Sequence, residues 1–301
     1  MNASLAESHS NKLLTLGVRS MLYSTIAFGL MNVFVKQLSH LPAMEVVFFR
    51  CLVSFAACIY GLRKFEASWI GNNHLLLVLR GTFGTAALYL FFLTIQNVPL
   101  ASAVTIQYLS PIFTTIIAIF LLGEKVLKFQ WVFYAISFIG VLVIKGFAVD
   151  FPVWYFVTGV ASAFFSGLAY NLVRSLKESE HPLVIVLHFQ IVGVAAGFLV
   201  CLFDWKTPVG IDWLYLLLTG ICTQIGQVNL TKALQAEKIA KVSILNYLGI
   251  LYALIFGWFL FGEIYRLQTI IGIMLVVTGV ILSILYSQRW TNAEELEVTK
   301  G

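Results

Sequence analysis

The sequence predicts an all-α integral membrane protein with ten transmembrane helices, arranged as two inverted five-helix repeats. The first reason is composition: 60% of the 301 residues are hydrophobic, 11% are charged, and the mean hydropathy is +0.91. Soluble domains carry roughly 25% charged residues. The second reason is the length of the apolar stretches, and the third is an internal similarity between the two halves of the chain.

Ten apolar stretches are long enough to cross a bilayer, whose core of ~30 Å requires roughly 20 residues per helix. Short connections that contain Pro, Gly or charged residues separate them. The stretches are 16–36, 43–62, 74–95, 101–122, 129–147, 152–173, 182–203, 211–232, 240–261 and 268–287. None of the connections is long enough to form a soluble domain.

The remaining segments and the cysteines predict little additional chemistry. Segment 1–15 is polar and lacks a basic start followed by an apolar core, so we expect no cleavable signal peptide. The acidic segment 290–301 is expected to be a loose tail. The cysteines lie inside apolar runs, which predicts buried thiols rather than disulfides or a metal centre, and no cofactor is expected. They are Cys51, Cys58, Cys201 and Cys222.

The positions of Lys and Arg predict the orientation in the membrane. If the N-terminus is cytoplasmic, fourteen of the 19 basic residues, Arg80 among them, fall on the cytoplasmic side and four on the outer side, and Arg50 lies inside a span. Such an excess follows the positive-inside rule. Segment 1–15 and tail 290–301 are therefore predicted to be cytoplasmic, in a multi-pass protein of a cell membrane of the bacterial inner-membrane type.

Two segments, 103–125 and 242–264, share seven identical residues of 23 at a spacing of 139. Segments 24–38 and 162–176 match at a spacing of 138, and segments 41–50 and 181–190 at 140. The chain therefore divides into repeats 16–147 and 152–287. Because five is odd, the second repeat enters the membrane in the opposite sense, as in alternating-access transporters. The alternative is an ancient duplication without functional consequence.

Four motifs carry a family resemblance: "MEVVFFR" (44–50), "LVLRG" (77–81), the segment 100–125 with "SP" and "GE", and "LFGE" (260–263). With these motifs the chain resembles EamA-type members of the drug/metabolite transporter superfamily from residue 16 to 287. It is most similar to branches with bacterial S-adenosylmethionine uptake carriers and the eukaryotic solute carrier 35 group G. The resemblance implies a ten-helix fold with a central cavity lined mainly by the first, third, fourth, sixth, eighth and ninth helices.

Polar side chains are costly in hydrocarbon, so they face the bundle interior, a water-filled cavity or one another. Polar and aromatic residues recur at helical spacing in the six stretches that the resemblance implies as cavity walls. For the amides the alternative is hydrogen bonding between helices, and for the tyrosines it is simple packing. The residues expected to bind a substrate are Asn32, Tyr89, Gln107, Tyr108, Ser166, Tyr170, Gln224, Gln227, Asn246 and Tyr247.

Pro111 predicts a bend in the stretch 101–122. A proline inside a helix lacks the N–H donor and clashes with the carbonyl four residues earlier, which belongs to Gln107. The freed carbonyl and the Gln107 side chain would then face a polar cavity together. The alternative is a tolerated kink that only shapes packing.

Arg50 is the one strong charge that we place inside a span. It either attracts an anionic substrate or extends outward to the lipid headgroups, and we favour the second, structural role. No Asp or Glu lies near the middle of a span. Proton-driven export of cationic drugs normally uses such a buried carboxylate, as the resemblance to small multidrug relatives implies. We therefore favour a facilitator or an exchanger.

The sequence favours a carrier for a small polar, zwitterionic metabolite such as an amino acid or an S-adenosylmethionine-like derivative. The alternatives are a multispecific exporter and a membrane sensor or assembly factor. An enzyme is not expected, because the metalloprotease motif and paired membrane aspartates are missing. The expected partners are a small-molecule substrate and the lipid bilayer, with no nucleic acid. "GVAAG" (193–197) packs helices or joins a weak homodimer, so the chain is a monomer or such a dimer.

Overall fold

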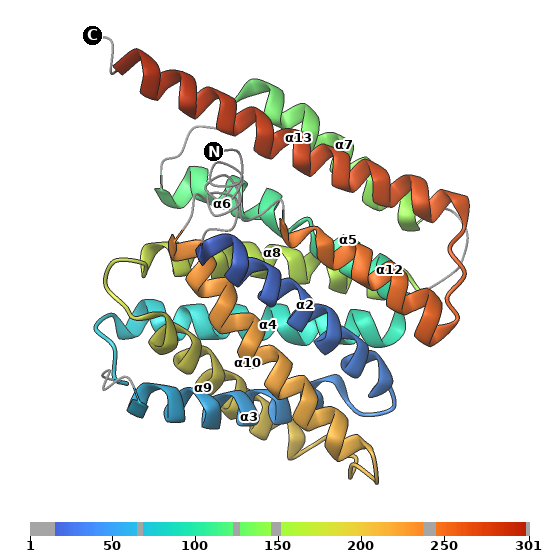
Figure 1. Ribbon diagram of the computed structural model, residues 1–301. Coiled ribbons are helices and arrows are strands. Elements are labelled where there is room, and N and C mark those ends of the chain that lie inside the picture. Colours follow the sequence, from blue (N-terminus) through green and yellow to red (C-terminus); the bar gives the residue numbers. More distant parts are fainter. Residues whose placement is uncertain (1–15, 65–68, 123–126, 146–151, 237–244, 299–301) are drawn as a thin grey trace, which may run out of the picture.

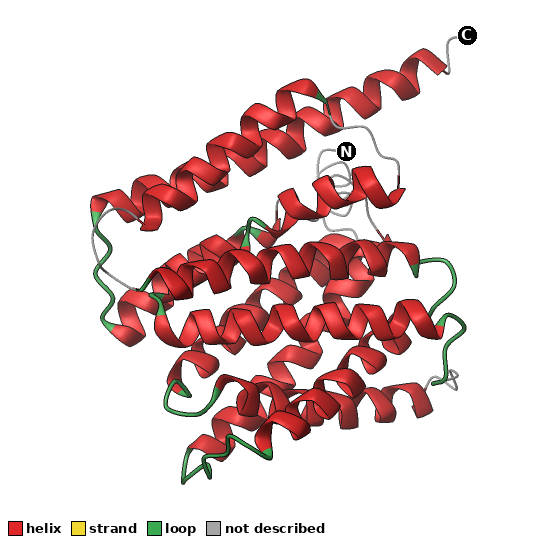
Figure 2. Ribbon diagram, turned by 180° about the vertical axis from the view of Figure 1, so that it is seen from behind, coloured by secondary structure: helices red, strands yellow, loops and turns green. Residues whose placement is uncertain are grey.

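The computed structural model describes residues 16–64, 69–122, 127–145, 152–236 and 245–298. Within these ranges the elements are helices joined by loops, and no strand occurs (Figure 2). The helices are α2 (Leu16–Gln37), α3 (Ala43–Lys64), α4 (His74–Asn97), α5 (Leu100–Gln107), α6 (Ser110–Leu122), α7 (Lys128–Lys145), α8 (Val153–Ser175), α9 (Pro182–Cys201), α10 (Asp212–Ala236), α12 (Leu248–Phe261) and α13 (Leu267–Val298).

Seven segments in the described part of the chain have the length and hydropathy to cross a membrane. They are Leu16–Gln37, Ala43–Lys64, His74–Asn97, Leu100–Leu121, Val153–Ser175, Pro182–Cys201 and Leu267–Tyr286. Two shorter apolar helices, Lys128–Ile144 and Leu248–Phe261, accompany them. The all-helical membrane architecture is confirmed, and the described helices fall on the predicted stretches, of which 146–147 and 240–244 lie outside the described residues.

Most helices pack against a partner from the other half of the chain. Helix α2 packs on α10, α4 on α8, and α3 on α9, while α5 contacts α12. Helices α7 and α13 pair along their length and form a separate layer at the top of Figure 1. Neither half therefore forms a closed bundle by itself, and the interior lies between them.

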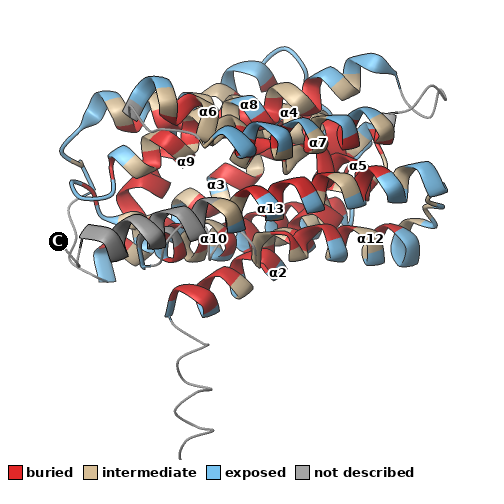
Figure 3. Cartoon of the chain, turned by 90° about the horizontal axis from the view of Figure 1, so that it is seen from above, coloured by how far each residue is buried: buried red, intermediate tan, exposed pale blue. Residues whose placement is uncertain are grey.

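Burial separates the interior from an apolar outer surface. Viewed from above, the buried residues lie on the sides of helices that face neighbouring helices, and the exposed ones gather at the periphery (Figure 3). The side chain of Phe92 is fully buried, whereas Phe259 of α12 and Leu142 of α7 are 77% and 61% exposed. A soluble protein rarely exposes so much apolar surface. Lipid is the solvent that suits this periphery.

One helix end differs from the sequence-based expectation, and one stretch is broken where Pro111 predicts a bend. Helix α13 continues to Val298, so most of segment 290–301 is helical rather than a loose tail. The run from Ala293 to Leu296 consists of strong helix formers, which explains the extension. The stretch 101–122 is divided: α5 ends at Gln107, Tyr108 and Leu109 form a turn, and α6 begins at Ser110.

Helices α7 and α13 approach closely because glycines face each other. An ideal Cβ built on Gly140 would lie 2.7 Å from the carbonyl oxygen of Gly272 and 2.8 Å from Cβ of Leu275. A Cβ on Gly272 would lie 2.7 Å from the carbonyl oxygen of Gly140. Small residues at such crossings allow membrane helices to pack backbone to backbone.

We expect the change Gly140→Ala to separate α7 from α13 and to lower the thermal unfolding temperature of the purified protein in detergent. Overpacking of this kind costs about 1–3 kcal/mol, which exceeds the gain of about 1 kcal/mol in helix propensity. The matched control is Gly61→Ala in α3, where the nearest atom, Cδ1 of Leu183, is 3.5 Å away. Equal unfolding temperatures for the two variants would contradict the proposed close packing.

Candidate functional site

A cavity of about 140 Å³ lies between the two halves of the chain. Helices α2, α3, α4, α5, α8, α9, α10 and α12 all contribute to its wall. Its polar and charged lining residues are Thr25, Asn32, Arg50, Arg80, Gln107, Tyr108, Ser110, Ser166, Tyr170, Gln227 and Asn246. Among the described residues that line it, none is acidic.

Two tyrosines meet beside this cavity where helices are interrupted. Tyr108 stands in the turn between α5 and α6, and Tyr247 is a turn residue between the helical residues 245–246 and α12. Their ring centroids are 4.9 Å apart. The hydroxyl of Tyr108 donates a hydrogen bond to the carbonyl oxygen of Asn246 at 2.5 Å. The interruptions of the two halves are thus joined directly.

The turn at Tyr108 follows from the local sequence. Pro111 cannot donate a hydrogen bond to the carbonyl of Gln107, so the regular ladder ends there. The N–H of Leu109 bonds the carbonyl of Ile106 at 3.0 Å, and the N–H of Ile112 bonds that of Leu109 at 3.0 Å, both in tight three-residue steps. This geometry brings both Gln107 and Tyr108 to the cavity wall.

The Gln107 amide connects α5 to α8. Its Nε2 donates to Oγ of Ser166 at 2.7 Å, and its Oε1 accepts from Oγ of Ser162 at 2.7 Å. The Ser162 hydroxyl also lies 2.7 Å from the carbonyl oxygen of Ala87, so one proton serves two acceptors. The Gln107 side chain is therefore an interhelical bridge and a part of the cavity wall at once.

Seven of the ten predicted substrate residues line the cavity, and three do not. Tyr89 is 37% exposed on the outside of α4. Gln224 contacts the thiol of Cys58 in α3, with Nε2 3.1 Å from Sγ. The ring of Tyr247 packs against that of Tyr108, and its buried hydroxyl has no partner among the described residues. The seven are Asn32, Gln107, Tyr108, Ser166, Tyr170, Gln227 and Asn246.

Tyr89 was assigned to the wrong face of its helix. The residues of α4 that line the cavity include Gly84, Ala87 and Leu88, whereas Thr85 and Tyr89 are not among them. Thr85 instead faces α9, where a Cβ on Gly193 would lie 3.6 Å from its Oγ1. The cavity face of α4 carries Gly84 and Ala87, which leave room for neighbouring side chains, and its polar lining residue is Arg80.

Arg50 does not extend to the lipid headgroups, so that interpretation was wrong. Its side chain is fully buried and lines the cavity, and its Nε donates to Oγ1 of Thr223 at 2.9 Å. The guanidinium carbon lies 5.3 Å from the ring centroid of Phe189. Helix α3 therefore contributes to the cavity wall, which the family resemblance did not imply.

Arg80 is a second cavity arginine, which we had counted among the cytoplasmic charges. It is 5% exposed, lines the cavity, and places its guanidinium carbon 4.6 Å from the ring centroid of Phe189. The sequence contained a usable signal. Arg80 is the seventh residue of α4, roughly 9 Å along the helix, and Arg50 is placed in nearly the same way as the eighth residue of α3.

Glu263 joins α12 to α5 and to Lys36 of α2 at one end of the bundle, and we call this set of contacts the Glu263 closure. Gly262 adopts a left-handed conformation with φ of 61°, which ends α12 and turns the next residue back toward α5. The Glu263 carboxylate accepts from the N–H of Leu100 at 2.8 and 2.9 Å, and Nζ of Lys36 lies 3.8 Å away. Anions are stabilised at a helix N-terminus such as that of α5.

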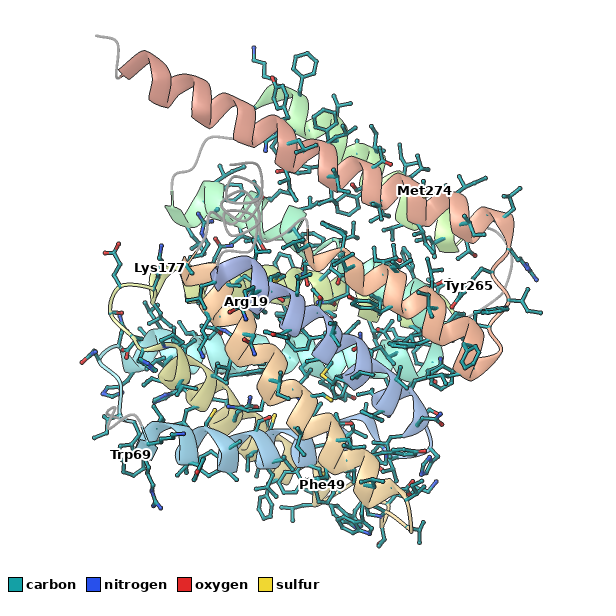
Figure 4. The ribbon with its side chains drawn as sticks, viewed as in Figure 1. Arg19, Phe49, Trp69, Lys177, Tyr265 and Met274 are labelled. Atoms are coloured by element: carbon teal, nitrogen blue, oxygen red, sulfur yellow. The ribbon has the colours of Figure 1, made fainter. Side chains whose placement is uncertain are left out.

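Tyr265 completes this closure from the connection between α12 and α13 (Figure 4). Its hydroxyl donates to Oε2 of Glu263 at 3.0 Å. Burial and the neighbouring Glu263 carboxylate both raise the pKa of Tyr265, so the phenol stays protonated and keeps donating at physiological pH.

Fold and site together define a membrane transporter, and comparison with known proteins identifies its family. The EamA-like transporter family matches residues 15–146 and again residues 153–285. The chain therefore belongs to the EamA-like transporter family, as the sequence motifs predicted. Members of this family are transporters rather than enzymes, and their place is the membrane.

Three relatives match nearly the whole chain. The pseudopaline exporter CntI of Pseudomonas aeruginosa is 29% identical, covering 89% of this chain and 96% of its own. Human solute carrier family 35 member G1 is 28% identical, covering 88% of this chain and 77% of its own. The S-adenosylmethionine uptake transporter of Rickettsia conorii is 26% identical, covering 91% of this chain and 93% of its own. A crystal structure shares the fold, with a TM-score of 0.66 at 18% identity, covering 91% of this chain and 97% of its own.

We expect Tyr108→Phe to lower the stability of the protein by about 1 kcal/mol, because it removes the hydrogen bond to the Asn246 carbonyl. Tyr247→Phe removes a hydroxyl that has no partner among the described residues, so its unfolding temperature should match or exceed that of the parent protein. Thermal unfolding in one detergent measures both. If Tyr247→Phe lowers the unfolding temperature as much as Tyr108→Phe does, the stabilising role assigned to the Tyr108 hydrogen bond is contradicted.

Proposed function

We propose that the protein is a secondary transporter that moves a small polar, zwitterionic metabolite, such as an amino acid or an S-adenosylmethionine-like derivative, by alternating access. One observation carries the proposal: both halves of the chain enclose a polar cavity where their interrupted helices meet. Interrupted helices at the interface of two repeats are where such transporters bind substrates. Amides and phenols on the wall suit a solute with an organic body and compact charges.

Equivalent hydrogen bonds in the two halves support the inverted repeat, with units 16–147 and 152–287. Ser24 Oγ donates to the carbonyl oxygen of Gly226 at 2.9 Å, and Ser162 Oγ lies 2.7 Å from that of Ala87. These pairs correspond at spacings of 138 and 139. Together with the excess of cytoplasmic Lys and Arg, an inverted arrangement places both termini in the cytoplasm.

The Glu263 closure supports the alternation. Alternating access requires the ends of the bundle to open in turn, so a transporter needs reversible contacts at each end. Glu263 joins α12 to α5 and to Lys36 by charged contacts that can exchange for water. Its repeat counterpart, Glu124, lies outside the described residues. Since the described lining residues include no acid, we propose substrate-driven facilitation or exchange rather than coupling through a cavity carboxylate.

We expect the purified protein in liposomes to catalyse counterflow of at least one solute from a panel of amino acids, S-adenosylmethionine, nucleotides and carboxylates. Ala169→Phe, which fills the cavity wall, should abolish this counterflow, because Ala169 lines the cavity. The control, Leu142→Phe, lies on the outer face of α7, where Leu142 is 61% exposed, and should retain it.

Two results of this experiment would change the conclusion. Absence of counterflow for every solute would refute transport and favour a sensor or assembly factor. Competition among chemically unrelated solutes would replace the metabolite carrier by a multispecific exporter. The liposome assay does not depend on whether the protein is a monomer or a weak homodimer.

We expect Glu263→Gln to open the closed end more often, because the neutral amide no longer pairs with Lys36 or serves as an anion for α5. A cysteine placed at Ser102, a buried residue of α5, reports this opening. A membrane-impermeant thiol reagent should label Ser102→Cys severalfold faster with Glu263→Gln than without it. The exposed control Glu178→Gln should have no effect, and unchanged labelling with Glu263→Gln would refute the gate.

A further inference from the structure

Arg50 from α3 and Arg80 from α4 form a positively charged corner of the cavity, which we call the arginine corner. Both side chains line the cavity, and their exposed fractions are 0% and 5%. Both guanidinium groups lie around Phe189 of α9, with guanidinium carbons 5.3 and 4.6 Å from the ring centroid. Helices α3 and α4 thus bring two permanent positive charges to one place, against a ring from α9.

The protein leaves most of this hydrogen-bonding capacity unused. Arg50 donates through Nε to Thr223, but its Nη1 and Nη2 have no partner among the described residues. For Arg80, Nε and Nη1 are likewise buried without a partner in the described part of the chain. The ion pairs within the same ranges involve other residues, and no acid there lines the cavity. Four buried guanidinium nitrogens of two residues that line the cavity therefore have no acceptor among the described residues.

Such a corner is unfavourable unless an anion enters it. Arginine does not lose its proton in proteins, so the charge cannot be removed by neutralisation. The ring of Phe189 compensates only part of the lost hydration. A buried ion without a counter-ion is strongly destabilising, whereas an acceptor with two oxygens satisfies both the charge and the free N–H groups.

The scaffold itself does not require these charges. Gln190 occupies the position of the second repeat that corresponds to Arg50, at a spacing of 140, and it is fully buried without a charge. Gly84 makes room for Arg80: a Cβ at this position would collide with Nη1 of Arg80 and would lie 3.0 Å from Cε2 of Phe189. The absence of a side chain at Gly84 therefore provides the space that the Arg80 guanidinium occupies at the cavity wall.

We propose that the arginine corner binds a carboxylate group of the transported solute, so that the substrate class is organic carboxylates. The proposal rests on the transport function proposed above and specifies its substrate. The planar guanidinium matches a carboxylate with two parallel hydrogen bonds. The side-chain amides of Gln227 and Asn246 also line the cavity and can contact the uncharged or cationic part of the solute.

The test measures binding of two probes of equal size to the purified full-length protein by calorimetry and thermal shift. Glutarate carries two carboxylates, and glutaramide replaces both by neutral amides. Glutarate should bind and raise the unfolding temperature, and glutaramide should not. Arg50→Gln and Arg80→Gln should each weaken glutarate binding by about tenfold or more, the loss expected for one charge-assisted pair. The exposed Arg63→Gln, also in α3, should leave it unchanged.

Folding and function are separated by further variants and readouts. Arg50→Lys and Arg80→Lys keep the charge and should retain part of the glutarate affinity, which keeps the test decisive if a glutamine variant does not fold. Failure of glutarate to bind the parent protein overturns the proposal, as does undiminished binding in both glutamine variants. Binding of glycerol 3-phosphate without glutarate overturns the choice of carboxylate.

The transport assay distinguishes this proposal from the proposed function. If glutarate binds through both arginines but no solute shows counterflow, the carboxylate site stands and transport fails. If counterflow occurs with a neutral solute, and neither glutarate nor Arg50→Gln and Arg80→Gln reduces it, transport stands and the carboxylate site fails.

Discussion

The site depends on the meeting of two interrupted helices, one from each half, where the Tyr108 hydroxyl donates a hydrogen bond to the Asn246 carbonyl. Interrupting a helix within hydrocarbon frees backbone groups that lipid cannot satisfy, so such interruptions persist only where protein or a wet cavity serves them. Here each half supplies an interruption, and the ring of Tyr108 packs on that of Tyr247. The constraint that joins the halves also places a polar cavity between them.

Duplication explains the walls of the cavity but not its charge. Serines at corresponding positions of α2 and α8 bond the backbones of α10 and α4, so each half holds the other in the same manner. Both cavity arginines come from the first half, and the second contributes Thr223 and the ring of Phe189 that surround Arg50. A symmetric scaffold thus holds an asymmetric site, which suits a solute with two chemically different ends.

The sequence predicted helices and their ends well, because hydropathy and proline positions act locally. The stretch 16–36 became Leu16–Gln37, and 43–62 became Ala43–Lys64. Seven predicted substrate residues line the cavity because buried amides and hydroxyls have few other places to lie in hydrocarbon. Gln224 shows the limit of this argument. Its side chain contacts the thiol of Cys58 in another helix, and no local sequence pattern reveals such a contact.

By itself the sequence determined that this is a helical membrane transporter of the EamA-like family, since apolar length and short motifs are properties of the chain alone. Only the tertiary structure decided which face of each helix lines the cavity. Neighbouring residues of a helix differ by about 100° in direction, so only the packing of adjacent helices sets the rotation of α4. That rotation turned Tyr89 outward and brought Arg80 inward beside Phe189.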